Sequence, residues 1–85
     1  MADERAIIER LQPLFREAFP KANVAAIGPH TVAEDVVGWD SFAHVALMVA
    51  VEEEFGLRFE PEEITGFSNV QELIAMIAQK LDAQT

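Results

Sequence analysis

Three residues with reactive side chains lie close together near the middle of the chain: Asp40, Ser41 and His44. A carboxylate, a hydroxyl and an imidazole are the components of a hydrolytic triad, in which Asp orients His while His contacts Ser. Ser41 and His44 can be neighbours on a helix because they are three positions apart. Three residues within one helical turn do not supply the triad geometry, and the chain has no Gly-x-Ser-x-Gly elbow. The sequence therefore argues against an enzyme and predicts no catalytic residue.

Ser41 is suited to a different chemistry, the attachment of a phosphate ester at the start of a helix. Asp40 is a good N-cap residue, because its carboxylate can accept a hydrogen bond from an N–H of the first turn. Ser41 then falls in that first turn, where unpaired N–H groups and the helix dipole stabilise negative charge. Gly38 permits the tight backbone that leads a loop into this helix. The pattern thus indicates a serine presented at a helix N-terminus, at a place suited to a phosphoryl group.

Acidic residues are abundant, but their spacing does not indicate a metal site. Counted from Asp40, a calcium-binding loop requires glycine at its sixth position and glutamate at its twelfth, and these are Val45 and Val51 here. The chain also has no cysteine, so it offers neither thiolate ligands nor disulfides. We therefore expect no bound metal.

The size of the chain and its apolar content predict one compact domain, residues 1–85. The hydrophobic fraction of 51% is sufficient for a small core. The longest unbroken apolar run, residues 45–51, is too short to cross a bilayer. Asp3 and Glu4 argue against a secretory signal. We expect a monomeric cytoplasmic domain.

The net charge of −9 favours a partner with basic patches over nucleic acid or an anionic membrane. The acids are concentrated in the middle of the chain. Between Glu34 and Glu63 there are nine of them, and Arg58 is the only Lys or Arg. This asymmetry indicates a docking face there, although a charge run is also what a merely solvated surface looks like.

Helical signals account for most of the chain. Asp3 can cap a first helix, whose apolar residues recur at helical spacing as far as Phe19, and Pro20 ends it. Pro13 predicts a bend or break near Gln12. A long connection follows over residues 20–40, with a single helical turn expected at Thr31-Val32-Ala33-Glu34 from its capping-box spacing. Four apolar side chains should pin this connection to the core: Ile27, Val32, Val36 and Val37.

The second helix is predicted over residues 41–55, with Gly56 as its C-cap. Its expected buried stripe comprises Phe42, Val45, Ala46, Val49 and Phe55, widened by Leu47, Met48 and Val51. Trp39 should pack the preceding loop onto the core, whereas His44 should lie on the solvated surface.

The rest of the chain predicts an extended link and two further helices. Leu57-Arg58-Phe59 alternates, Pro61 suits the start of a short third helix anchored by Ile64, and Ser68-x-x-Gln71 has the capping-box spacing that opens a last one. The side chains of the last helix that should face the core are Val70, Leu73, Ile74, Ile77 and Leu81. We expect a shared core of Phe42, Val49, Phe55, Leu73 and Ile77. No strand pattern of useful length is present, so the predicted fold class is all-α.

Asp40-Ser41-Phe42 resembles the Asp-Ser-Leu signature of acyl carrier proteins, with Phe in place of the usual Leu. The likeness continues through Val45, Leu47, the segment 52–56, Ile64 and the segment 70–81. It covers most of the chain, in the same order of elements.

The resemblance implies a four-helix bundle with a long first loop and a short third helix. It also implies that Ser41 carries 4′-phosphopantetheine, an arm that holds acyl groups as thioesters and moves them between enzymes. The implied partners are a phosphopantetheinyl transferase and acyl-loading and acyl-using enzymes with basic docking patches. The candidate partner-binding residues are Asp40, Phe42, His44, Glu52, Glu53, Glu62 and Glu63.

Departures from the family pattern bear on the pathway. Ala43, His44 and Ala46 occupy a stretch that is often acidic, and Val36 replaces a frequent Asp. These departures argue against the housekeeping fatty-acid synthase carrier. The form Gly-Trp-Asp-Ser is similar to that of stand-alone carriers of specialised pathways, including polyketide and aminoacyl types. The resemblance as a whole implies a carrier for fatty-acid, polyketide or related specialised biosynthesis. Two alternatives stay open: an aminoacyl or peptidyl carrier, and a helical interaction module without a prosthetic group. Modification of Ser41 distinguishes the second alternative from a carrier.

Overall fold

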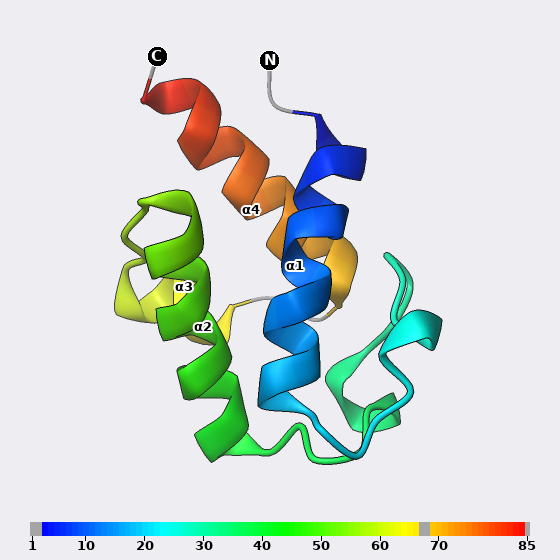
Figure 1. Cartoon of the computed structure of the whole chain (residues 1–85). Coiled ribbons are helices and arrows are strands. Elements are labelled where there is room, and N and C mark those ends of the chain that lie inside the picture. Colours follow the sequence, from blue (N-terminus) through cyan, green and yellow to red (C-terminus); the bar gives the residue numbers. More distant parts are fainter. Residues whose placement is uncertain (1–2, 67–68, 85) are drawn as a thin grey trace.

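The computed structural model describes residues 3–66 and 69–84, and over these ranges the chain folds as four α-helices without strands (Figure 1). The elements in chain order are α1 (Glu4–Ala18), the 3₁₀ turns η1 (Val24–Ala26) and η2 (Ala33–Asp35), α2 (Ser41–Phe55), α3 (Pro61–Thr65) and α4 (Val70–Ala83). The predicted all-α fold, with its long first loop and short third helix, is confirmed.

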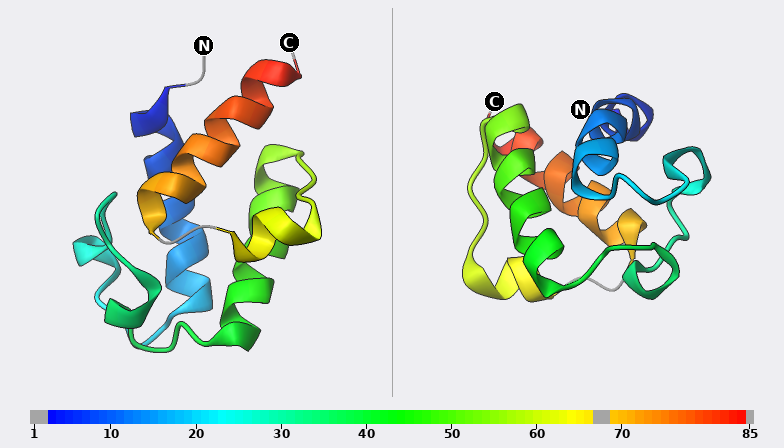
Figure 2. Two further views of the ribbon diagram at one scale, coloured as in Figure 1. Left: turned by 180° about the vertical axis from the view of Figure 1, so that it is seen from behind. Right: turned by 60° about the horizontal axis from the view of Figure 1, so that its bottom comes forward.

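The helix α1 holds the bundle together, because it packs against both α2 and α4. Figure 2 shows the long first loop on the side of α1 that faces away from α2. The start of α1 and the end of α4 lie at one end of the molecule, and the start of α2 lies at the other (Figures 1 and 2). None of the helices in the described ranges is long and apolar enough to cross a membrane.

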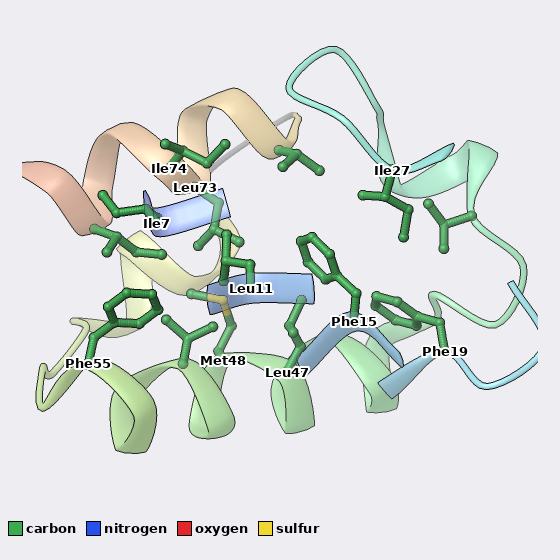
Figure 3. Close-up of a cluster of buried hydrophobic side chains, with 14 of the residues drawn as sticks. Ile7, Leu11, Phe15, Phe19, Ile27, Leu47, Met48, Phe55, Leu73 and Ile74 are labelled. Atoms are coloured by element: carbon green, nitrogen blue, oxygen red, sulfur yellow. The ribbon is translucent and has the colours of Figure 1, made fainter. Parts of the chain in front are cut away.

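The core is formed by apolar side chains from the three long helices and the loops between them (Figure 3). Its fully buried members are Leu11, Phe15, Phe19, Leu47, Met48, Val51, Val70, Leu73, Ile74 and Ile77. Leu57 and Phe59 are buried and Arg58 is exposed, as the predicted extended link requires. The inward face predicted for α4 is confirmed for four of its five residues, and Leu81 is only partly buried.

A bend or break was expected near Gln12. The helix α1 runs through Pro13 without interruption, so the break is wrong. A proline inside a helix costs about 3 kcal/mol because one backbone hydrogen bond is lost and the ring meets the preceding turn. Leu11 and Phe15 flank Pro13 and are completely buried, and each buried side chain of this kind contributes about 1.5–3 kcal/mol. Burial on both sides of Pro13 therefore outweighs its local cost. The cap at Asp3 is confirmed, since its side chain accepts a hydrogen bond from the Arg5 N–H at 3.0 Å.

The buried face of α2 differs from the predicted stripe. Phe42, Val45 and Val49 are exposed, with 85%, 54% and 49% of their surface accessible. The side chains that face the core are Leu47, Met48, Val51 and Phe55 (Figure 3). The segment is apolar on almost every side between Phe42 and Val51, so periodicity alone does not select the inward face. Packing against α1 selects it instead, and the expected burial of Phe42 and Val49 in the shared core is wrong.

The ends of α2 and α3 follow the predicted signals. Gly56 is left-handed, with φ of 68°, and its N–H donates to the Glu52 carbonyl. Pro61 is the first residue of α3, and Glu63 accepts a hydrogen bond from the Glu60 N–H at 2.7 Å. The predicted cap Ser68 lies outside the described residues. Asn69 caps α4 by accepting a hydrogen bond from the Glu72 N–H at 3.0 Å.

The long first loop is fixed to the start of α4 by two backbone hydrogen bonds. The Val70 N–H donates to the Thr31 carbonyl at 2.9 Å, and the Gln71 N–H donates to the Pro29 carbonyl at 2.8 Å. The single turn predicted at residues 31–34 is observed as η2, Ala33–Asp35. Thr31 does not cap this turn, because its hydroxyl accepts a hydrogen bond from the Gly28 N–H instead. The turn η1 was not predicted.

The loop side chains expected to anchor this segment divide into two groups. Ile27 and Val36 are buried, and Val32 is partly buried. Val37 is 62% exposed, which contradicts its expected role as an anchor. Its neighbour Val36 takes the core position because consecutive side chains in extended backbone point to opposite sides.

Two phenylalanines on the same helix give a direct test of the observed face of α2. Phe55→Ala should destabilise the fold by about 3–5 kcal/mol, because a large buried side chain is removed. Phe42→Ala should change stability by less than about 0.5 kcal/mol, because its ring is exposed. Urea unfolding of both variants measures the difference. Equal losses at the two positions would contradict the face described here.

Candidate functional site

Ser41 is the first residue of α2, and its side chain is exposed. Asp40 caps the helix as predicted: its Oδ1 accepts a hydrogen bond from the Ala43 N–H at 2.8 Å, and its carbonyl accepts one from the His44 N–H at 2.9 Å. The cap fixes the backbone on both sides of Ser41. The backbone of Ser41 is thereby held at a defined position, and its side chain is exposed on the surface.

The turn before α2 depends on Gly38. Its φ is 89°, a left-handed value that costs a residue with a Cβ roughly 1–2 kcal/mol. The Trp39 N–H donates to the Val36 carbonyl at 3.2 Å, and the Asp40 N–H donates to the Gly38 carbonyl at 3.0 Å. These bonds make the tight entry into the helix that the sequence predicted.

Trp39 attaches this turn to α1. Its ring stacks on Phe19 with 4.8 Å between centroids, and Phe15 lies 6.3 Å away. Trp39 is partly buried, so the predicted role of packing the loop onto the core is confirmed. Aromatic pairs at these separations contribute about 0.5–1.5 kcal/mol beyond the burial of their area.

His44 differs from its prediction as a solvated surface residue. It is partly buried, and its Nδ1 lies 3.0 Å from Trp39 Nε1. Its Nε2 lies 2.6 Å from the Ile64 carbonyl oxygen in α3. Trp39 and His44 were predicted to have separate roles. The hydrogen bond between them was not predicted, because Trp39 precedes the helix and helical spacing therefore does not relate it to His44.

The surroundings of Ser41 fit an attached phosphoryl group. Ser41 shares a shallow hollow with Ala33, Trp39, Asp40 and His44. Within the described ranges, no hydrogen bond uses the backbone N–H of Ser41 or of Phe42. Both N–H groups belong to the first turn of a 15-residue helix, where partial positive charge attracts an anion. The donor set therefore matches a phosphodiester on the Ser41 hydroxyl.

Two of the four predicted partner-binding glutamates act inside the fold. Glu52 Oε2 accepts a hydrogen bond from the Phe59 N–H at 2.8 Å. Glu63 pairs with Lys80 at 2.9 Å, in addition to its bond with the Glu60 N–H. These contacts hold the extended link to α2 and hold α3 to α4.

Glu53 and Glu62 are exposed and stay available to a partner. Glu53 lies twelve residues along α2 from Ser41, a distance of about 18 Å at 1.5 Å per residue. The structure therefore brings Asp40, Phe42 and His44 together with Ser41, but places Glu52 and Glu53 at the far end of the helix. Among the described residues, no group of three or more His, Asp or Glu side chains could hold a metal ion.

Comparison with known proteins assigns the family. The profile of the family described as a phosphopantetheine attachment site matches residues 9–77. The chain is also 28% identical over 82 residues to an acyl carrier protein of Streptomyces coelicolor, and the match covers 96% of this chain and 89% of that protein. The chain therefore belongs to the acyl carrier protein family, which is a family of carriers rather than catalysts. Its cofactor is a covalently attached 4′-phosphopantetheine.

The contacts of Glu63 predict a pH dependence. The Glu60 N–H and then the Lys80 ammonium hold the pKa of Glu63 below its ordinary value. Because the pKa is lowered in the folded protein, the ionised carboxylate stabilises the fold at pH values above the ordinary pKa of a glutamate. This stabilisation is lost as the pH falls through the lowered pKa. Glu63→Gln should therefore lower the thermal midpoint at neutral pH, and the difference from wild type should vanish in acid.

A neighbouring exposed glutamate supplies the control for this measurement. Glu62→Gln removes the same charge from the same helix, at a side chain that is exposed. It should leave the midpoint almost unchanged across the same pH range. A difference between wild type and Glu63→Gln that persists at acidic pH would show that the ionised carboxylate is not the stabilising group.

Proposed function

We propose that Ser41 carries the 4′-phosphopantetheine arm, and that the protein holds acyl intermediates for fatty-acid, polyketide or related specialised biosynthesis. The observation that supports this assignment is the position of Ser41: it is exposed, it is the first residue of α2, and its own N–H and that of Phe42 have no hydrogen-bond partner among the described residues. The arm, when attached, supplies the thiol on which acyl groups are held as thioesters. The chain has no cysteine of its own to compete for them.

The residues around Ser41 have distinct proposed roles. The Ser41 hydroxyl is the nucleophile toward the group that a phosphopantetheinyl transferase delivers, and that enzyme supplies the base. Asp40 fixes the first turn by capping it, and its charge adjoins the modified oxygen. The N–H groups of Ser41 and Phe42 bind the phosphodiester. We propose that residues 1–85 act as one carrier domain.

The two serines of the chain allow a controlled test of attachment. On co-expression with a broad-specificity phosphopantetheinyl transferase, the intact protein should gain the mass of one phosphopantetheine. Ser68→Ala should gain the same mass, and Ser41→Ala should gain none. Modification of Ser41→Ala at the wild-type level would refute the assignment of Ser41. No mass gain in any of the three proteins would favour a helical interaction module without a prosthetic group.

We infer that partner enzymes dock on the exposed face of α2 beside Ser41. Phe42, Val45 and Val49 follow one another at helical spacing and are all exposed. Exposed apolar side chains that gather on one face are typical of a protein-binding surface. Asp40 lies at one end of this face and Glu53 at the other, with Glu62 on α3, so a partner with an apolar pocket between basic residues would match it. Asp40 and Phe42 are the members of this face nearest the attachment site.

Rate measurements separate the charged and apolar contributions to docking. Reversing Glu53 and Glu62 to Lys should slow association with the transferase and flatten its dependence on salt, because long-range attraction is lost. Phe42→Ala should instead raise the dissociation rate and leave the salt dependence unchanged. Reversal of Glu9 and Glu17 on α1 makes the same change in net charge elsewhere and serves as the control. If both reversals slow association equally, total charge alone governs the rate.

A further inference from the structure

His44 joins three parts of the chain that are far apart in sequence. The Trp39 indole belongs to the turn before Ser41, the imidazole to the first turn of α2, and the Ile64 carbonyl to the last turn of α3. The carbonyls in the last turn of a helix have no partner within the helix, so a side-chain donor there satisfies an otherwise unpaired group. One imidazole ring thus connects the attachment turn with the neighbouring helix.

The hydrogen-bond partners fix the tautomer of the ring. An indole N–H can only donate and a carbonyl oxygen can only accept. Nδ1 must therefore accept from Trp39 at 3.0 Å and carry no proton, while Nε2 must carry the proton that it donates to Ile64 at 2.6 Å. Both bonds form together only with the neutral ring protonated at Nε2.

The helix α3 depends on such external contacts. It has five residues, and a helix of this length is not stable by itself. Ile64 packs against the core, and Glu63 pairs with Lys80 of α4. The bond from His44 to the Ile64 carbonyl ties α3 to the first turn of α2. On the other side of the ring, Trp39 is held by Phe19, so the connection reaches as far as α1.

We propose that His44 is a positioning residue that clamps the attachment turn to α3, and that protonation of its ring opens the clamp at Trp39. In the imidazolium form both nitrogens donate. Nδ1–H then faces the indole N–H, and two donors cannot bond to each other. The bond to Ile64 survives, but the partly buried indole loses its acceptor, so the link from the attachment turn through Trp39 and the ring to α3 is broken. The range to examine is the one in which histidine side chains ordinarily change charge, about pH 5 to 8.

Several charged groups on the surrounding elements act on this equilibrium. Asp40 lines the same hollow as His44, and Glu34 and Asp35 follow Ala33, which lines it as well. In α3 the charged groups are Glu62 and Glu63, and Glu63 is paired with Lys80. The clamp is closed at the alkaline side of the transition and open at the acidic side.

The chain contains its own optical probe for this transition. Trp39 is the only tryptophan, there is no tyrosine, and His30 is the only other histidine. Trp39 emission should change through one titration step between about pH 8 and 5.5 as its bond to His44 is lost. His44→Gln should abolish the step, because a glutamine amide offers both an acceptor and a donor but does not titrate. His30→Gln, an exposed control, should keep it.

Nuclear magnetic resonance of the wild-type protein tests the same proposal without a substitution. The ring nitrogens of His44 should show the Nε2–H tautomer at pH 8 and convert to imidazolium with the midpoint seen in fluorescence. The proposal is overturned if His44 is found in the Nδ1–H tautomer. It is also overturned if the fluorescence step persists in His44→Gln or disappears in His30→Gln. These readouts use the unmodified protein and do not depend on the function of Ser41.

A consequence for modification follows if Ser41 is the attachment site, and this part rests on the proposed function. An uncoupled turn presents Ser41 less uniformly to the transferase. The ratio of wild-type to His44→Gln modification rates should fall about fivefold between pH 8 and 5.5, the scale of one hydrogen bond. Because the ratio cancels the pH profile of the enzyme, a constant ratio would refute this consequence. Failure to modify either protein would instead count against the proposed function.

Discussion

The stacking of Trp39 on Phe19 is the contact on which the arrangement of the site depends. The segment between α1 and α2 contains only short 3₁₀ turns, and its backbone hydrogen bonds to α4 lie at Pro29 and Thr31, so the part next to α2 needs a separate anchor. The indole fixes the end of that segment to the core side of α1 immediately before the helix that presents Ser41. A serine that another enzyme must bind benefits from a backbone that is already fixed, because a mobile loop would have to be ordered each time the two proteins bind.

Local signals predicted the ends of the helices well. Asp3, Asp40, Gly56 and Pro61 all occupy the capping or first-turn positions expected of them. Capping depends on a few neighbouring backbone groups, so a short stretch of sequence contains the necessary information. The position of Ser41, the proposed attachment site, at a capped helix start could be predicted for the same reason, since its environment is almost entirely the cap of its own helix.

Features that depend on packing between helices were not predicted from sequence. The inward face of α2 was assigned incorrectly because Phe42 and Leu47 are equally apolar, and only the position of α1 distinguishes them. A bend or break near Gln12 was expected from the local geometry of Pro13, but the burial of side chains on both sides of Pro13 keeps the helix unbroken. The role of His44 depends on the Ile64 carbonyl, twenty residues away, and a backbone acceptor carries no sequence signal.

The bonds from Val70 and Gln71 to the carbonyls of Thr31 and Pro29 have a consequence for synthesis on the ribosome. The long loop emerges about forty residues before its partners in α4. Until then its buried side chains Ile27 and Val36 have no complete core to enter. Contacts this far apart in sequence slow folding, because the intervening chain must first be ordered. The nascent chain therefore completes its fold only after α4 has left the exit tunnel, so the bundle assembles late and as one unit.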